Sequence, residues 1–282
     1  PASPPQTSSS SIFKPMSIAE KLALVRSRVE KASGCGAGEA GAPRLVAVSK
    51  LMEVPLLMEA YAAGQRHFGE NYVQEICQKA PQMPKDIHWH FIGHLQTNKC
   101  NQLLKTVSSL HMVESVDSAK LATALDKACV ASKRSAKLKV MIQVNTSSED
   151  SKSGCEASEC VSVVQHVLDK CPHLEFVGLM TIGKMGDPNP TPYFELLCEC
   201  RKVTVEMLGM KQKVELSMGM SGDFELAIAK GSTNVRVGST IFGSRPPKPA
   251  AAGGVPTVTK IPGDWEGCGH VYTVTWCKEC IP

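Results

Sequence analysis

The 282-residue sequence has no apolar stretch long enough to cross a membrane and no run of basic residues longer than two. Its formal net charge of +4 is small, and the basic residues are dispersed along the chain. These features argue against a polybasic membrane patch and against a dedicated nucleic-acid groove. Nothing in the sequence resembles a signal peptide. We therefore expect a soluble protein whose partners are neither membranes nor nucleic acids.

The twelve cysteines do not require an oxidising compartment. Several fall at apolar positions of segments with helical period, where a free thiol acts as a small hydrophobe, so reduced thiols inside a cell are favoured. Residues 1–16 are rich in Pro and Ser and carry one basic residue, Lys14. A mitochondrial transit peptide would carry several arginines. We expect a cytoplasmic protein with a disordered tail or cloning remnant at residues 1–16, and a mitochondrial address is the alternative.

Short apolar runs alternate with segments of helical period from residue 17 onward. Eight of the runs are typical of strands. Such an alternation favours a single α/β domain, a (β/α)8 TIM barrel, over an open doubly wound sheet. The expected strands are 45–49, 67–69, 87–92, 110–113, 138–144, 174–180, 214–217 and 234–237.

An extra helix is expected before the first strand. Ser17 and Glu20 stand three residues apart, as in a capping box. The apolar residues that follow lie on one helical face: Ile18, Leu22, Val25 and Val29. Residues 17–245 are therefore predicted to form the barrel with this helix at its N-terminus.

The segment 246–282 differs in composition from the predicted barrel. It begins with the linker-like run PPKPAAAGGVP and has the sequence CGHVYTVTWCKEC close to its end. Four zinc ligands are available, but the two pairs are closer together in sequence than in known structural sites. We predict a Pro/Gly-rich linker and an unpaired Cys-containing extension, and the alternative is zinc bound by Cys268, His270, Cys277 and Cys280.

The first expected strand, in the stretch RLVAVSK, ends on Ser49 and Lys50. A strand that emerges into water can end in this way. In a barrel, however, chemistry is found at the C-terminal ends of the strands. An amine held there can act as a Schiff-base nucleophile, so Lys50 is a candidate for that role.

Small residues follow the last two expected strands. Loops at these places often bind phosphate, because backbone N–H groups can approach the oxygens and a helix N-terminus favours an anion. Ser221 is also expected to cap the next helix and Gly231 to end it. Tight turns are the alternative for either loop alone, but the two loops together favour phosphate. The residues are Ser217, Gly219, Ser221, Gly222, Gly238, Ser239 and Thr240.

A phosphate site near a strand-end lysine indicates pyridoxal 5′-phosphate (PLP), whose phosphate anchors one end while its aldehyde needs an amine at the other. Arg236 lies in the eighth expected strand, two residues before Gly238. Opposite the ring nitrogen, its permanent charge would keep that nitrogen unprotonated and weaken the ring as an electron sink. A structural ion pair is the alternative role for Arg236.

Six blocks carry a resemblance to a known family: LVAVSK, FGENYVQE, WHFIGHLQ, LEFVGLMTIG, SMGMSGDF and GSTNVRVGSTIFG. In this order, from about residue 45 to about residue 245, they resemble the pyridoxal phosphate homeostasis protein family, also called the proline synthetase co-transcribed homologue family. The resemblance implies a barrel like the N-terminal domain of alanine racemase, with PLP as an internal aldimine on Lys50. It further implies that Asn71 and Ile92 lie beside the cofactor, that Arg236 faces the pyridine nitrogen, and that the phosphate is held by Ser217, Ser221, Gly238 and Ser239.

The same resemblance implies that the cofactor is buffered and delivered, with PLP-dependent apo-enzymes as recipients, rather than used in a well-defined turnover reaction. One departure concerns the first block, because many family members continue as SKTKP. Here Met52 occupies the place of the second lysine. Any role of that lysine in passing on the cofactor is in doubt here, and Lys152 is a candidate mobile amine.

Two alternative functions are considered. A PLP-dependent amino-acid racemase would need a second, β-rich domain like that of alanine racemases, and too few residues follow Arg245 to build one. A metal hydrolase could begin with His88 and His90, which would share one face of the third strand, but it needs further ligands at other strand ends. Structural histidines are favoured. A monomer is expected, because no coiled-coil heptad asks for a partner.

Overall fold

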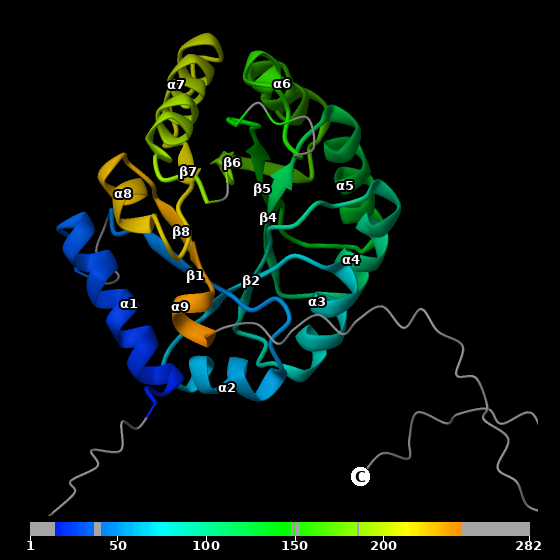
Figure 1. The fold of residues 1–282 in the computed structure, drawn as a ribbon. Helices are drawn as coiled ribbons and strands as arrows, with labels where there is room; N and C mark the ends of the chain where they lie inside the picture. Colours follow the sequence, from blue (N-terminus) through cyan, green and yellow to red (C-terminus); the bar gives the residue numbers. More distant parts are fainter. Residues whose placement is uncertain (1–14, 37–40, 148, 150–152, 185, 244–282) are drawn as a thin grey trace, which may run out of the picture. The chain divides into compact units, whose positions relative to one another are not determined.

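The computed structural model describes residues 15–36, 41–147, 149, 153–184 and 186–243. Eight parallel strands close into a barrel, with each strand paired to the next in the chain and β8 paired to β1 (Figure 1). The predicted (β/α)8 barrel is confirmed. The strands are β1 (Arg44–Val48), β2 (His67–Glu70), β3 (His88–Phe91), β4 (Leu110–Val116), β5 (Leu138–Gln143), β6 (Leu174–Met180), β7 (Glu215–Ser217) and β8 (Asn234–Val237).

Helices surround the barrel on the outside (Figure 1). Their apolar faces and the outward-facing strand residues form one large core, in which Phe68, Trp89, Phe91, Phe194 and Phe224 are fully buried. None of the described helices is both long and apolar enough to span a membrane. The helices are α1 (Ile18–Ser33), α2 (Val54–Ala62), α3 (Val73–Lys79), α4 (Cys100–Thr106), α5 (Ala119–Ala131), α6 (Cys160–Lys170), α7 (Thr191–Met207), α8 (Phe224–Ala229) and α9 (Ser239–Phe242).

The extra helix α1 begins at the predicted capping box. The backbone N–H of Glu20 donates to Ser17 Oγ at 3.2 Å, and the backbone N–H of Ser17 donates to Glu20 Oε2 at 2.7 Å. The four apolar residues predicted to share a face are all buried, and α1 packs against α2, α8 and α9. The helix therefore covers the place where the first and last units of the barrel meet (Figure 1).

Each predicted strand boundary lies within one residue of the observed one except at the end of β4. The run 87–92 predicted a longer β3 than the four residues observed, and β4 continues to Val116 instead of ending at Val113. The polar pair Glu114 and Ser115 hid this continuation from an apolar pattern. Both residues are buried inside the fold, and the β4–β5 register shifts between Val113 and Val116.

Three earlier predictions lie outside the described residues. They are the disordered tail, apart from its last two residues, the mobile role of Lys152, and the linker and zinc alternative of the C-terminal extension.

Candidate functional site

The C-terminal ends of the strands meet at an open cleft of about 940 Å³. Its lining comes from β1, β8 and α8 and from the segments that follow β1, β2, β3, β6, β7 and β8. Seven of the eight predicted cofactor residues are brought to this cleft: Lys50, Asn71, Ile92, Ser221, Arg236, Gly238 and Ser239. The eighth, Ser217, is fully buried and does not line the cleft.

The backbone next to Lys50 is held by hydrogen bonds from a buried lysine of α3. Lys79 Nζ donates to the backbone oxygen of Ser49 at 2.8 Å, to Glu70 Oε1 at 2.7 Å and to Glu75 Oε1 at 2.6 Å. The same Glu75 oxygen accepts from the backbone N–H of Leu51 at 2.5 Å. The two residues on either side of Lys50 are therefore held by one network.

This network also holds a costly backbone conformation. Leu51 has a φ of 64°, in the left-handed region that a residue with a branched side chain rarely adopts. Burial raises the pKa of Glu70 to about 7, although the charge and hydrogen bond of Lys79 oppose the shift. The sequence did not reveal this role of Lys79, because its partners are backbone and carboxylate groups of three separate elements.

Replacing Lys79 by methionine is expected to destabilise the fold by about 3–5 kcal/mol, because it leaves two carboxylates near each other without their buried cation. Urea unfolding measures this loss. Lys127→Met, at an exposed position of α5, is the control and should stay within about 0.5 kcal/mol of wild type. Equal midpoints for the two variants would show that Lys79 does not support the loop.

Gly93 allows two strand ends to approach each other at the cleft. A Cβ atom there would lie 2.1 Å from the backbone oxygen of Asn71, a separation that no relaxed structure holds. Gly93→Ala is expected to push the Asn71 and Ile92 segments apart and to destabilise the fold by roughly 1–3 kcal/mol. Thermal unfolding tests this against Gly222→Ala, because a Cβ at Gly222 meets nothing within 4 Å. Two variants with the same melting temperature would contradict the expected clash.

The loops after β7 and β8 are tied together by Ser221. The backbone N–H of Gly238 donates to Ser221 Oγ at 3.2 Å. The prediction that Ser221 caps the next helix is wrong: Asp223 precedes α8, and its Oδ1 atom accepts from the backbone N–H of Met220 at 2.6 Å. The prediction that Gly231 ends this helix is confirmed, since Gly231 follows the last turn with a φ of 94°.

Arg236 lines the cleft but is almost entirely buried. Its Nη1 atom donates to Ser217 Oγ, and Nη2 donates to the backbone oxygen of Thr181 at 2.8 Å. Ser217 Oγ in turn donates to Glu114 Oε2 at 2.5 Å. Ser217 therefore joins Arg236 to a buried carboxylate beneath the cleft, because β7 ends with this side chain turned toward the barrel interior.

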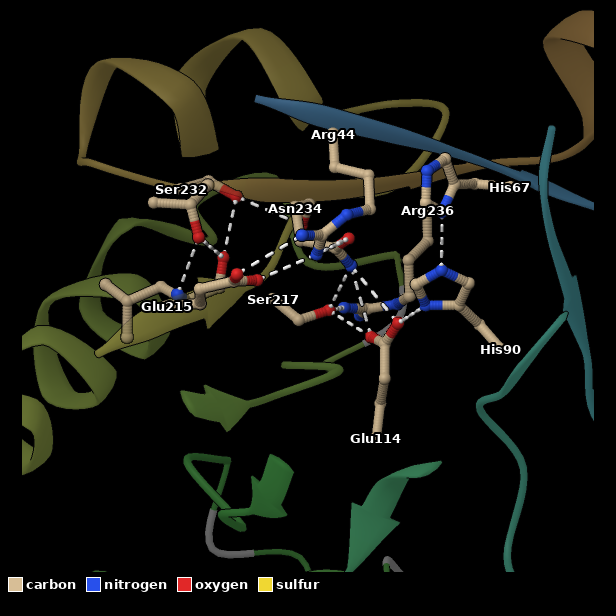
Figure 2. Close-up of polar contacts among 11 residues, drawn as sticks. Arg44, His67, His90, Glu114, Glu215, Ser217, Ser232, Asn234 and Arg236 are labelled. Carbon is tan, nitrogen blue, oxygen red and sulfur yellow. Dashed lines mark hydrogen bonds and ion pairs between the residues drawn. The ribbon is translucent and has the colours of Figure 1, made fainter. Parts of the chain in front are cut away.

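Glu114 is the centre of a polar network inside the barrel (Figure 2). Its two oxygens accept from His90 Nδ1 at 2.6 Å and from Asn234 Nδ2 at 3.2 and 3.3 Å, in addition to Ser217. Burial alone would raise the pKa of Glu114, but the hydrogen bond and charge of His90 and the charge of Arg236 lower it to about 2. The carboxylate is therefore ionised and balances the buried guanidinium of Arg236.

The structure places the pair proposed for a metal hydrolase at the wrong end of the barrel. His88 is the first residue of β3, at the N-terminal face, and the ring of His90 lies in the interior against Glu114. Neither reaches the cleft at the C-terminal ends. The physical reason is the geometry of β3: His88 is at the start of the strand, and the side chain of His90 points into the barrel interior, where Glu114 binds it.

Comparison with known proteins first identifies the family of barrels to which this fold belongs. Residues 30–246 match the family model described as alanine racemase, N-terminal domain. The alanine racemase of Corynebacterium glutamicum has the same fold, with a TM-score of 0.61 at 16% identity over 83% of this chain and 62% of that one.

Closer similarity narrows the class. The pyridoxal phosphate homeostasis protein of Homo sapiens is 51% identical over 213 residues, which cover 72% of this chain and 77% of the human chain. The structure of PipY from Synechococcus elongatus, with PLP bound, is 33% identical, has a TM-score of 0.69, and is matched over 80% of this chain and 100% of that chain. The chain belongs to the pyridoxal phosphate homeostasis protein family, as the six sequence blocks indicated.

Proposed function

We propose that this chain binds PLP as a Schiff base on Lys50 and buffers or delivers the cofactor in intracellular vitamin B6 homeostasis, without a robust catalytic reaction. The observation that carries the proposal is the meeting of Lys50, Arg236 and the small-residue loops in one cleft. The relatives support it, since one is named for PLP homeostasis and another was solved with PLP.

The residues of the cleft fit such a ligand. Asn71 lines the cleft. Its Oδ1 atom is buried and accepts no hydrogen bond from the described residues. A buried amide oxygen without a donor is costly, so a polar ligand beside Asn71 would remove that cost. Gly238 and Ser239 line the cleft, and Ser221 links their loop to the one after β7.

When bound, PLP supplies an aldehyde that condenses reversibly with an amine. The chain's own groups then have distinct tasks. Lys79 and Glu75 hold the backbone on both sides of Lys50, so the amine is presented at a fixed place. Arg236, fixed by Ser217 and Thr181, presents a cation and not a carboxylate to the cleft. A guanidinium does not take up a proton from a ring nitrogen or share one with it, which disfavours the strong electron sink that most PLP catalysis needs.

The racemase alternative needs an acid or base placed against the substrate. Three carboxylates line the cleft: Asp187, Asp223 and Glu225. Asp187 accepts from the Tyr193 hydroxyl at 2.6 Å, Asp223 accepts from the backbone N–H of Met220, and Glu225 pairs with Arg28 at 2.7 Å. All three are thus engaged within the chain, which favours a carrier over an enzyme. A monomeric, cytoplasmic carrier that hands PLP to apo-enzymes is part of the proposal.

A transfer assay tests the function. The chain is loaded with PLP, freed of excess cofactor by gel filtration and mixed with a PLP-dependent apo-enzyme, whose recovered activity is followed over time. We expect the chain to retain PLP through the column and then to restore the apo-enzyme. In parallel, the chain is incubated with single amino acids. Sustained racemisation or decarboxylation, or an inability to retain PLP, would overturn the proposal.

A further inference from the structure

Four imidazoles gather at the N-terminal face of the barrel, opposite the cleft. They come from the starts of three neighbouring strands, and we call them the histidine cluster: His67 of β2, His88 and His90 of β3, and His111 of β4. The ring centroids of His67 and His88 are 4.7 Å apart, those of His88 and His111 are 4.8 Å apart, and His90 lies 5.3 Å from His111. Nothing in the proposed function uses this cluster.

Three members of the cluster offer converging nitrogen atoms. One ring nitrogen from each of His67, His90 and His111 lies within 4.8 Å of the other two. Within the described part of the chain, no other group of three or more His, Cys, Asp or Glu side chains brings its ligand atoms this close together. The closest pair is His67 Nδ1 and His90 Nε2, at 2.9 Å. Imidazole ligands of a tetrahedral zinc ion stand roughly 3.4 Å apart, so only small ring movements separate the present arrangement from a metal site.

His90 is oriented as a metal ligand is. Its Nδ1–H donates to Glu114 at 2.6 Å, and on the other side of the ring Nε2 lies 2.9 Å from His67 Nδ1. A carboxylate behind a ligating histidine fixes the tautomer and raises the basicity of the ligand nitrogen. Figure 2 shows this line of side chains from Glu114 through His90 to His67.

The outer rings of the cluster are reachable, because His67 and His111 are only partly buried. A surface depression of about 450 Å³, lined by His88, His111 and Lys139 among others, gives a path from solvent.

The charges around the cluster restrict which cation can bind. Arg44 and Lys139 face it, which opposes a hard cation that depends on charge alone. Arg44 is itself paired with Glu215 at 2.7 Å, and Glu114 places a negative charge behind His90. Imidazole nitrogen donors without a ligating carboxylate suit zinc or copper rather than magnesium or calcium.

We propose that the histidine cluster binds one divalent transition-metal ion of the zinc type, with His67 Nδ1, His90 Nε2 and a ring nitrogen of His111 as ligands and His88 or water in the fourth position. The metal links β2, β3 and β4 at the face of the barrel that carries no cofactor chemistry. Binding to the folded chain alone stabilises that fold by mass action.

Equilibrium dialysis of the full chain against Zn²⁺ tests the site, with His111→Phe and His67→Asn as variants and His173→Asn, an exposed histidine outside the cluster, as the matched control. We expect one ion that is lost or bound at least tenfold more weakly in both cluster variants and retained in the control. The thermal midpoint should rise with Zn²⁺ in the wild type and the control alone. Binding that survives both cluster substitutions would overturn the proposal.

X-ray absorption of the wild-type zinc protein gives an answer that does not depend on any variant folding. A shell of nitrogen ligands with imidazole scattering is expected. A shell of sulfur ligands would assign the metal to the cysteines instead, and less than about half an ion per chain at saturating Zn²⁺ would remove the site. Neither measurement requires PLP, so failure of this proposal and failure of the carrier proposal are distinguishable.

Discussion

Lys50→Ala is expected to abolish the attachment of PLP that borohydride fixes, because no other described lysine that lines the cleft stands within two residues of the end of a barrel strand. The wild-type chain with PLP should show the visible band of a protonated Schiff base. After reduction, the label should be found on the peptide that contains Lys50. The absorbance spectrum before and after borohydride, followed by mass spectrometry of the digest, measures the effect.

Lys184→Ala is the control for this experiment. Lys184 also lines the cleft, but it lies in the loop after β6 rather than at the end of a strand. Its substitution should leave the band and the labelled peptide unchanged. A band that persists in Lys50→Ala would move the attachment to another lysine, and the absence of a band in wild type would return Lys50 to the role of a surface residue.

The barrel could be predicted because its strands are short apolar runs at regular intervals. Parallel strands covered by helices must be apolar on their outer face, and the runs around Ala47, Val140 and Leu179 meet that need. The pattern failed at Glu114 and Ser115, where the barrel interior is polar. An interior carboxylate interrupts an apolar run in the same way as a turn does, so the sequence could not distinguish the two.

The cleft could be predicted in part for a related reason. Lys50 and Gly238 follow strands, and barrel closure brings strand ends to one place whatever the loops between them. The supporting residues could not be found, because their partners are distant in the sequence and depend on which way each side chain points. Lys79 reads as an ordinary polar position of a short helix, and Ser217 as a loop serine, until the partners Ser49, Glu70 and Glu114 are placed.

The hydrogen bonds of Lys79 and Glu75 explain why an apolar strand is followed by a lysine at this place. The backbone at Ser49 and Leu51 is bound by Lys79 and Glu75, so the chain cannot simply continue outward into water after β1. A left-handed Leu51 and a buried lysine are both costly. Leu51 is next to Lys50 and Lys79 binds the backbone on its other side, which indicates that the fold fixes the position of this amine at the expense of stability.

Glu114→Ala is expected to destabilise the fold strongly, by an amount comparable with that of Lys79→Met. The substitution leaves the guanidinium of Arg236 without its counter-charge and leaves His90, Ser217 and Asn234 without their shared acceptor. Removing one partner from a buried charge network costs about 3–5 kcal/mol. Urea unfolding of Glu114→Ala and of Glu175→Ala, an exposed glutamate on β6, measures the difference.

The pH dependence of that difference separates a charge effect from a packing effect. The folded-state pKa of Glu114, about 2, lies below the ordinary value of 4.5, so its carboxylate contributes stability that is fully present above pH 4.5 and is lost as the pH falls towards 2. The gap between wild type and Glu114→Ala should therefore narrow over this range. A gap that stays constant with pH would mean that Glu114 acts by its volume, and Arg236 would then need another counter-charge to remain buried beside the cleft.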